Sequence, residues 1–451
     1  MQDQRLNILI YPMLSVDNVN ADSNYIIIKK LTHAILDQTD RYNFFLMMDK
    51  DRDFVNDLDP KVELLYVPMI RGKTHQVVSY PYKIFQKILK DLPIDIIWNN
   101  IVEQGHHLPR IFGGFEEDRQ TKVLNFHHYI IHRSLNPTVY RYAENILWQQ
   151  LAGSSLVNLN YFHTQYCYDM LMEEARDWLR PKKVQQIEER SHVELGGYCT
   201  HPPKVERYKK YSFIYNHRLD GYKDFETTFK LFDRLYREKY DFQVVITGGD
   251  SKNVNPFAEK PYAVVKSFKK HDEYLEEVAR CHANVTNSFH ETYCISIAES
   301  IVADHLVIAP NRVTFPELLG KDYPYLYRSV NDEYDFMKKA ASERLEYASH
   351  VNKEKMYVES GAKVMIGLFE TLAKGITPVI DRMKDQKKAG LLREWAKGHP
   401  SVTLQESMIK LYDLRYATQS MPPNKVAQLL RDLGYSYQPR VRRFTRREGH
   451  L

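Results

Sequence analysis

Short apolar runs alternate with helix-like segments along most of this chain, in two successive series. Strands buried on both faces of a parallel sheet read as continuous apolar runs, and parallel neighbours need a crossover between them. The alternation therefore predicts an α/β fold with two Rossmann-like domains. The predicted strands are Leu6–Tyr11, Asn43–Met48, Val62–Val67, Ile94–Trp98, Lys122–Phe126 and Leu156–Asn160 (the last strand of the first series), then Tyr211–Tyr215, Phe242–Thr247, Ala263–Val265, Ala283–Thr286 and Leu306–Ala309.

Helical periodicity between these runs, and changes in composition, predict the domain organisation. A charged passage with prolines near residues 180–210 is the expected linker between the two Rossmann-like domains. The predicted helices are Tyr25–Gln38, Tyr82–Leu92, one running to Arg180, Phe225–Lys239, Asp272–Cys281, Ile297–Val302 and a long one near Lys353–Ala373. The expected units are residues 1–185, 205–375 and 385–451.

Composition limits the class of protein. Hydrophobic residues make up 43% of the 451 residues and charged residues 27%, which excludes wholesale disorder. No apolar run approaches the roughly 20 residues that a membrane-spanning helix needs. Four scattered cysteines without C-x-x-C spacing predict neither a disulfide framework nor a zinc site. We therefore expect a cytoplasmic protein.

Two glutamates, Glu291 and Glu299, stand eight residues apart across a loop that opens into an amphipathic helix. The start of a helix points free N–H groups and the positive end of its dipole toward such a loop, which suits a diphosphate. Glu291 would then lie beside the anion, and Glu299 could accept hydrogen bonds from a ribose. A carboxylate for a sugar, N–H groups for phosphate and a carboxylate for ribose are typical of a nucleotide-sugar site.

The stretch Ser288–Glu299 resembles the E-x7-E motif of family 4 glycosyltransferases, and Arg218-Leu-Asp-Gly-Tyr-Lys223 resembles their R-L-x-x-x-K element. The resemblance implies the GT-B fold, retention of anomeric configuration and a nucleotide-sugar donor, with a UDP-sugar expected. Arg218 and Lys223 would stabilise the leaving diphosphate, so no metal is expected. The remaining donor-binding residues that the resemblance implies are Gly248, Gly249, Thr292, Tyr293, Cys294 and Glu299, with Glu291 acting on the sugar.

The chain departs from the family pattern in two loops. The acidic motif of the family reads E-G-F-G, but here Thr292 and Cys294 replace both glycines, which restricts how closely the backbone can approach the sugar phosphate. The loop over residues 12–23 also lacks the family's glycine-rich turn. Either the donor approaches this loop less closely, or polar side chains such as Ser15 and Asn18 bind it.

Histidines follow the strand that ends at Phe126. His127 resembles the strand-end histidine that contacts the donor sugar in the family, which implies a catalytic role; His128 is the alternate, and a purely structural histidine is the other interpretation. At the end of the preceding strand, polar residues are candidates for acceptor contacts. These candidates are Asn99, Asn100, Glu103 and His106.

The last part of the chain, from Asp381, has a net charge of roughly +8, which exceeds the +5 of the whole sequence, so the preceding residues sum to about −3. Thr403 to Glu406 has capping-box spacing, and Ser420 precedes a second helical pattern that ends at Gly434. Residues 435–447 then alternate aromatic and basic residues, as a small hairpin would. The module resembles a winged helix-turn-helix.

Three interpretations of this module are open: binding of double-stranded DNA, binding of an anionic lipid surface, or a solvated tail. Arginines interleaved with aromatic residues favour nucleic acid. Sugar transfer joined to DNA binding resembles phage enzymes that glycosylate hydroxymethylated pyrimidines, such as hydroxymethylcytosine, to evade restriction. We therefore predict such a DNA-modifying glycosyltransferase. The alternatives are a membrane-peripheral glycosyltransferase of surface polysaccharide synthesis and a non-catalytic DNA-binding sensor.

Overall fold

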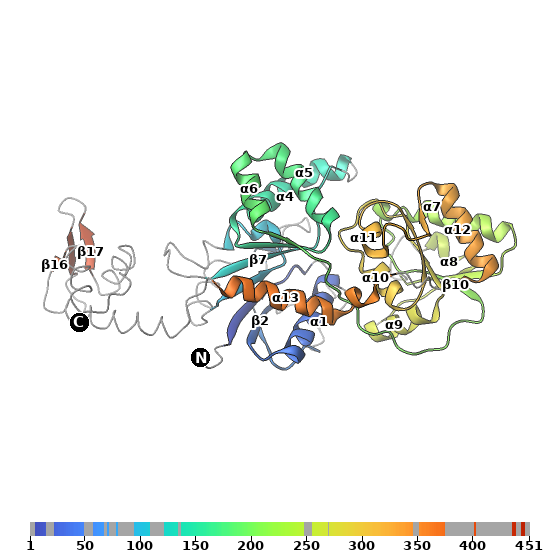
Figure 1. Cartoon of the computed structure of the whole chain (residues 1–451), viewed down its shortest axis with the longest axis horizontal. Coiled ribbons are helices and arrows are strands. Elements are labelled where there is room, and N and C mark those ends of the chain that lie inside the picture. The colour runs from blue at the N-terminus through green and yellow to red at the C-terminus, as the bar shows by residue number, and fades with distance from the viewer. Residues whose placement is uncertain are drawn as a thin grey trace.

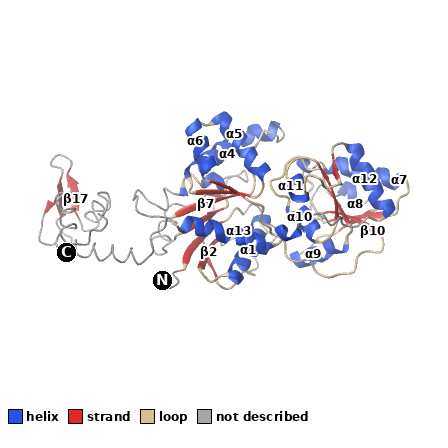
Figure 2. Cartoon of the chain, in the orientation of Figure 1, coloured by secondary structure: helices blue, strands red, loops and turns tan. Residues whose placement is uncertain are grey.

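Two parallel β-sheets, each flanked by helices, make up most of the computed structural model (Figures 1 and 2). This confirms the predicted α/β fold with two Rossmann-like units. The structure describes residues 5–14, 22–48, 57–66, 70–71, 78–79, 94–108, 121–133, 137–247, 255–268, 270–345, 351–374, 401–402, 435–438 and 443–446. The predicted helix Tyr82–Leu92, the loop residues Ser15 and Asn18, and the pair Gly248 and Gly249 lie outside these ranges.

The first domain is built on a seven-stranded sheet in the order β3-β2-β1-β6-β7-β8-β9, with every neighbouring pair parallel. Its strands are β1 (Leu6–Tyr11), β2 (Tyr42–Met48), β3 (Val62–Tyr66), β6 (Ile96–Asn99), β7 (Lys122–His127), β8 (Leu159–Phe162) and β9 (Ser191–Val193). Its helices are α1 (Ser23–Gln38), the 3₁₀ turn η2 (Val102–Gln104), α4 (Pro137–Leu156), α5 (Gln165–Trp178) and α6 (Pro181–Glu189), and β4 (Ile70–Arg71) pairs with β5 (Val78–Ser79).

The second domain is built on a six-stranded parallel sheet in the order β12-β11-β10-β13-β14-β15. Its strands are β10 (Tyr211–Tyr215), β11 (Phe242–Ile246), β12 (Ala263–Val265), β13 (Ala283–Val285), β14 (Leu306–Pro310) and β15 (Leu326–Tyr327). Its helices are η3 (Gly221–Lys223), α7 (Phe225–Arg237), α8 (Asn255–Ala258), α9 (His271–Arg280), α10 (Ile295–Val302), α11 (Phe315–Leu319) and α12 (Val330–Glu343).

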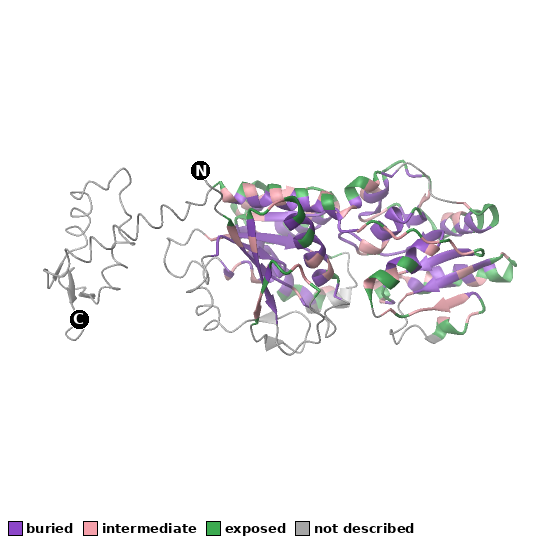
Figure 3. Ribbon diagram, turned by 90° about the horizontal axis from the view of Figure 1, so that it is seen from below, coloured by how far each residue is buried: buried purple, intermediate pink, exposed green. Residues whose placement is uncertain are grey.

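The central strands of both sheets are almost wholly buried, as Figure 3 shows in purple. β10 and β14 bury every residue, and β1 buries its last four. Such continuous burial is the physical reason that these strands read as unbroken apolar runs in the sequence. Within the described part of the chain, no helix has both the length and the apolarity to cross a membrane.

One prediction about the first sheet was wrong. The sequence suggested that Leu156–Asn160 is the last strand, but β9 follows it and pairs with β8 at the edge of the sheet. β9 has only three residues, all half-buried, so it has no apolar run to reveal it. It lies within the passage that was expected to be linker, and α6 occupies part of the same passage.

The helix α13 (Val358–Ala373) follows the short turn η4 (Lys353–Met356) and packs on the first domain, although it follows the second in sequence (Figure 1). Phe369 of α13 contacts the rings of Tyr42 and Trp98, with centroid distances of 5.4 and 6.1 Å. Arg41 forms an ion pair with Glu370 at 2.6 Å. The chain therefore passes from the first domain to the second and back again.

The basic C-terminal region contains a small antiparallel sheet in the order β16-β18-β17. Its strands are β16 (Ser401–Val402), β17 (Tyr435–Gln438) and β18 (Arg443–Arg446). The pairing of β17 with β18 confirms the predicted hairpin. The two helices predicted after Thr403 and Ser420 lie outside the described residues.

Candidate functional site

The candidate site lies where the strand order of the second sheet reverses. β10 is flanked by β11 on one side and by β13 on the other. The chain runs from β10 outward through β11 and β12, then crosses back to β13 and continues outward on the opposite side. In open α/β sheets, ligands bind at this switch point, outside the carboxyl ends of the strands. The loops after β10 and β13 meet there, where the amide of Phe289 donates to the carbonyl of Tyr222 (2.8 Å).

A buried ion pair joins these two loops. The ammonium group of Lys223 donates a hydrogen bond to the carboxylate of Glu291, and about nine-tenths of each side chain is buried. Burial alone would lower the pKa of Lys223, but the adjacent Glu291 carboxylate outweighs it and raises that pKa. The structure thus brings together two residues that the sequence analysis selected from different motifs.

Arg218 of the same motif differs from Lys223 in exposure. Its side chain is 76% exposed, and it contacts only the neighbouring Tyr222 hydroxyl (2.8 Å) and Asp220 carboxylate (3.4 Å) among the described residues. An exposed guanidinium can reorient toward an incoming anion at little cost and can bind two of its oxygens at once. The two cations therefore provide one fixed charge and one adjustable charge.

Cys294 takes a left-handed backbone conformation immediately before α10, with φ of 71°. Glycine adopts this conformation without strain, which suits the glycine found at this position of the motif that the sequence resembles. The sulfur of Cys294 is buried, and burial raises the pKa of its thiol. The cysteine therefore preserves the turn into the helix as a neutral, inert side chain.

Thr292 and Tyr293 contact the first domain. The hydroxyl of Thr292 donates to the carbonyl of His128 (2.6 Å), and the hydroxyl of Thr164 donates to the carbonyl of Thr292 (2.8 Å). The ring of Tyr293 packs against Tyr198 at 4.9 Å. The threonine that replaces a family glycine therefore forms part of the contact between the domains.

A second polar contact between the domains lies at the start of α5. The carboxylate of Glu317, in α11, accepts hydrogen bonds from the backbone amides of Gln165 and Tyr166, both at 2.7 Å. Those amides are among the N–H groups that a helix leaves unpaired at its first turn. Sequence reasoning missed this role, because a carboxylate that caps a helix of another domain has no local sequence signal.

Glu299 is fully buried in a polar network that also reaches the first domain. Its carboxylate accepts a hydrogen bond from the Tyr274 hydroxyl (2.6 Å) and lies 3.5 Å from His271, which in turn contacts the ammonium group of Lys30 in α1 (3.1 Å). Burial raises the pKa of Glu299, and the positive charge of Lys30 partly opposes this. Glu299 and Glu291 thus have different partners.

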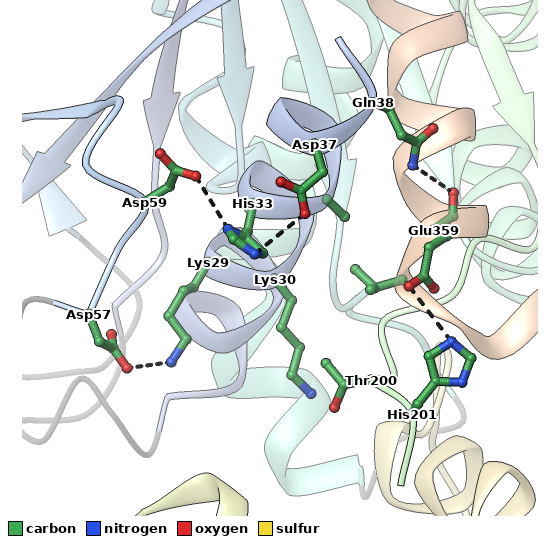
Figure 4. Close-up of a pocket in the computed structure, with 12 residues that line it drawn as sticks. Lys29, Lys30, His33, Asp37, Gln38, Asp57, Asp59, Thr200, His201 and Glu359 are labelled. Atoms are coloured by element: carbon green, nitrogen blue, oxygen red, sulfur yellow. Dashed lines mark hydrogen bonds and ion pairs between the residues drawn. The ribbon is translucent and has the colours of Figure 1, made fainter. Parts of the chain in front are cut away.

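Lys30 also lines a pocket of about 480 Å³ between α1, residues 57–59, the crossing segment at residues 200–201 and the start of α13 (Figure 4). Several charged groups in this pocket are paired with one another. Figure 4 shows the pairs of Lys29 with Asp57 (2.6 Å), His33 with Asp59 (3.3 Å) and with Asp37 (3.5 Å), and His201 with Glu359 (3.8 Å). This pairing gives the pocket little preference for an ionic ligand.

His127 is fully buried, and its Nδ1 has no hydrogen-bonding partner in the described part of the chain. Its Nε2 lies 3.2 Å from the amide oxygen of Asn160, and its ring stacks on Phe162 at 4.1 Å. Burial lowers the pKa of His127 to about 4. The alternate, His128, lies at the domain contact, where its carbonyl binds Thr292 and its Nε2 lies 2.8 Å from Asn100.

The candidate acceptor residues at the end of β6 form buried contacts. The amide of Asn99 donates to the side chain of Asn125 (2.7 Å), and Asn100 donates to the carbonyl of Tyr11 (3.3 Å). Glu103 accepts hydrogen bonds from Tyr129 and from Gln150 (3.0 Å). The ring of His106 packs on that of His107 at 3.7 Å. These side chains fix the end of the sheet.

One group of side chains has the composition of a metal site: a ring nitrogen of His217, a carboxylate oxygen of Glu291 and the sulfur of Cys294 lie within 4.8 Å of one another. Lys223 already provides a positive charge to this Glu291 carboxylate. A divalent cation would have to displace that ammonium group and to bind a thiol that burial keeps protonated. The arrangement suits an anion better than a cation.

No family model and no curated protein matches this sequence. The structure, however, is similar to sucrose-phosphate synthase from Thermosynechococcus elongatus, with a TM-score of 0.56, 11% identity and coverage of 86% of this chain and 100% of that one. It is similar to Anabaena HepE in complex with UDP-glucose, with a TM-score of 0.54, 11% identity and coverage of 82% of this chain and 99% of that one. It is also similar to a UDP-forming trehalose-phosphate synthase from Burkholderia xenovorans with bound glucose-6-phosphate, with a TM-score of 0.54, 10% identity and coverage of 82% of this chain and 100% of that one. At these identities the similarity shows the fold, which is GT-B.

Proposed function

We propose that this protein is a retaining glycosyltransferase that uses a nucleotide-sugar donor. The observation that carries the proposal is the Lys223–Glu291 pair, which joins two separated motifs at the switch point of the second domain. A fixed cation beside a carboxylate matches the needs of a donor whose diphosphate leaves and whose sugar has hydroxyl groups to bind. The GT-B similarity supports the same activity.

Each residue near the switch point has a proposed role. Lys223 and Arg218 bind the donor diphosphate, Glu291 binds sugar hydroxyls and Glu299 binds the ribose. Glu299 is held by Tyr274 and His271, so a ribose has to replace or join one of these partners. We assign the sugar contact from the first domain to His128, because its backbone carbonyl already contacts Thr292 of the second domain.

The proposed reaction needs no enzyme nucleophile and no metal. The acceptor hydroxyl attacks the anomeric carbon on the face that the diphosphate leaves, and a departing phosphate oxygen takes the proton. Lys223 and Arg218 stabilise the negative charge that develops on the diphosphate. Structural neighbours that contain UDP-glucose, or whose reaction forms UDP, support a UDP-sugar as donor.

We propose double-stranded DNA with hydroxymethylated pyrimidines as the acceptor. The support is the basic C-terminal module, which contains the β16-β18-β17 sheet and has a net charge of roughly +8. Lys and Arg side chains bind the phosphates of DNA. Because α13 packs on the first domain, the chain leaves for this module from the domain that binds acceptors in our proposal.

A surface feature favours a second acceptor, the lipid-linked glycan of a membrane-peripheral enzyme. The rings of Trp148 and Trp178 contact each other at 5.4 Å although each is more than 40% exposed. The exposed basic residues Arg180 and Lys182 follow Trp178 in the sequence. Exposed tryptophan beside basic residues is typical of proteins that bind the lipid–water interface.

The test supplies radiolabelled UDP-sugars with hydroxymethylcytosine DNA, hydroxymethyluracil DNA, unmodified DNA or lipid-linked glycan. We expect label in hydroxymethylated duplex, and a loss of at least about 100-fold in the Lys223→Met variant, since each fixed charge at a transition state contributes that much. Label only in the lipid-linked glycan would support the second acceptor. The absence of both transfer and donor hydrolysis with every donor would refute glycosyl transfer itself.

A further inference from the structure

A buried histidine at the switch point has a ring nitrogen without a partner. His217 follows the end of β10 by two residues, and only 4% of it is exposed. Its Nδ1 lies 2.8 Å from the hydroxyl of Ser296, but its Nε2 contacts no hydrogen-bonding group in the described part of the chain. Buried polar atoms are nearly always satisfied, so this nitrogen indicates an absent partner.

The position of His217 indicates what that partner is. A ring nitrogen of His217 lies within 4.8 Å of both Glu291 and Cys294, and Glu291 holds the ammonium group of Lys223. The imidazole of His217 therefore belongs to the group of side chains around the proposed diphosphate site.

The charge state of His217 follows from its surroundings. Burial lowers its pKa well below the usual value, and the positive charge of Lys223 lowers it further. The other groups that face it are Glu291 and the protonated thiol of Cys294. The imidazole is therefore neutral at physiological pH, with one nitrogen that donates and one that accepts.

Ser296, in the first turn of α10, is the hydrogen-bonding partner of Nδ1. Its hydroxyl can donate to Nδ1, and its only other hydroxyl contact in the described residues is a weak one with the sulfur of Cys294 at 3.5 Å. When the hydroxyl donates to Nδ1, the proton of the neutral ring resides on Nε2. Nε2 is then a hydrogen-bond donor that has no acceptor in the described part of the chain.

We propose that Nε2 of His217 donates a hydrogen bond to a phosphate oxygen of a bound nucleoside diphosphate, and that Ser296 selects the required tautomer. This inference rests on the proposed function and adds a phosphate-binding residue that neither sequence motif contains. A neutral donor here complements the two cations, because it binds the diphosphate without strengthening repulsion around Lys223. With His217, diphosphate binding depends on a residue close to the end of β10 as well as on the loop that carries Lys223.

The test measures binding of UDP and of uridine to the full-length protein by calorimetry. A hydrogen bond to a charged group stabilises binding enough that its loss weakens UDP affinity about 10- to 100-fold. We expect this loss in His217→Leu, a smaller loss of about threefold in Ser296→Ala, and near-normal affinity in His217→Gln, whose amide can place a donor near Nε2. Uridine affinity should stay unchanged in all three variants.

His305→Gln is the matched control, since His305 is a buried histidine of the same domain that also has one unpartnered ring nitrogen, Nδ1, but it immediately precedes β14 rather than a motif residue. Its Nε2 lies 2.8 Å from the carbonyl of Val278. Equal losses for UDP and uridine in His217→Leu would assign His217 a structural role and overturn the inference. Normal UDP affinity in that variant, with affinity lost in Lys223→Met, would overturn it while leaving the proposed function intact. A wild-type protein that binds no nucleoside diphosphate would refute the proposed function, and the inference with it.

Discussion

The Lys223–Glu291 pair gives the sharpest test of the site, because replacing Glu291 should strengthen UDP binding whereas replacing Lys223 should weaken it. Both side chains are about nine-tenths buried, so removing one leaves the other as an uncompensated buried charge. Such a change lowers the free energy of unfolding by about 3–5 kcal/mol. We expect Glu291→Gln and Lys223→Met each to lower the melting temperature of the second domain by about 10 °C.

Addition of UDP separates the two variants. In Glu291→Gln the diphosphate takes the place of the missing carboxylate beside Lys223, so UDP should bind more tightly than to the wild type and restore much of the lost stability. In Lys223→Met the diphosphate would meet the unpaired Glu291 carboxylate, so UDP should bind weakly and stabilise little. The double variant Lys223→Met/Glu291→Gln should recover most of the stability without ligand, because neither charge is then left unpaired.

Thermal unfolding followed by circular dichroism, with and without UDP, measures all four proteins. Equal stabilisation of both single variants by UDP would refute the reasoning, because Lys223 would then not be the group that the diphosphate neutralises. A double variant as unstable as either single variant would show that the loss arises from altered packing rather than from a buried charge.

Three further outcomes are expected. Arg218→Met should leave the melting temperature unchanged, because the side chain is mostly exposed, but should raise KM for the donor in a transfer assay, with Arg234→Met as a control elsewhere on the domain. The free energy of unfolding should fall as the pH drops from about 6.5 to 4, because His127 has a pKa of about 4 in the folded protein and is protonated earlier in the unfolded chain. His127 accounts for about 3 kcal/mol of this fall, so the free energy of unfolding of His127→Gln, measured by urea titration, should depend less on pH. Thr292→Val should lower the free energy of unfolding by about 1 kcal/mol through loss of the hydrogen bond to the carbonyl of His128, whereas Thr292→Ser should keep this bond and the stability. Chemical denaturation measures both variants, and equal losses would contradict a stabilising role for the Thr292 hydroxyl.

The sequence predicted the elements that depend on local pattern. Continuous apolar runs such as Leu306–Ala309 became buried parallel strands, and the Arg218–Lys223 motif lies after β10 as the resemblance implied. These features succeed because a parallel sheet determines both the burial of its strands and the edge at which their loops gather.

The features that the sequence did not predict depend on contacts between distant segments. Glu299 matches a motif, but its partners Tyr274, His271 and Lys30 come from two other helices in two domains. His217 adjoins a motif residue, yet its orphan nitrogen becomes visible only once Ser296 and Cys294 are placed around it. His127 was selected by its position at a strand end, but the adjacent strand β8 covers it with Phe162.

The return of α13 to the first domain has a consequence for how the chain is made. A ribosome releases the strands of the first domain long before Phe369, which completes the aromatic contacts with Tyr42 and Trp98. The first domain therefore stays incomplete throughout synthesis of the second, with part of its apolar surface uncovered. Because its last helix is made last, a nascent chain that stalls before residue 358 should depend on chaperones, and a fragment that ends near residue 200 should be poorly soluble.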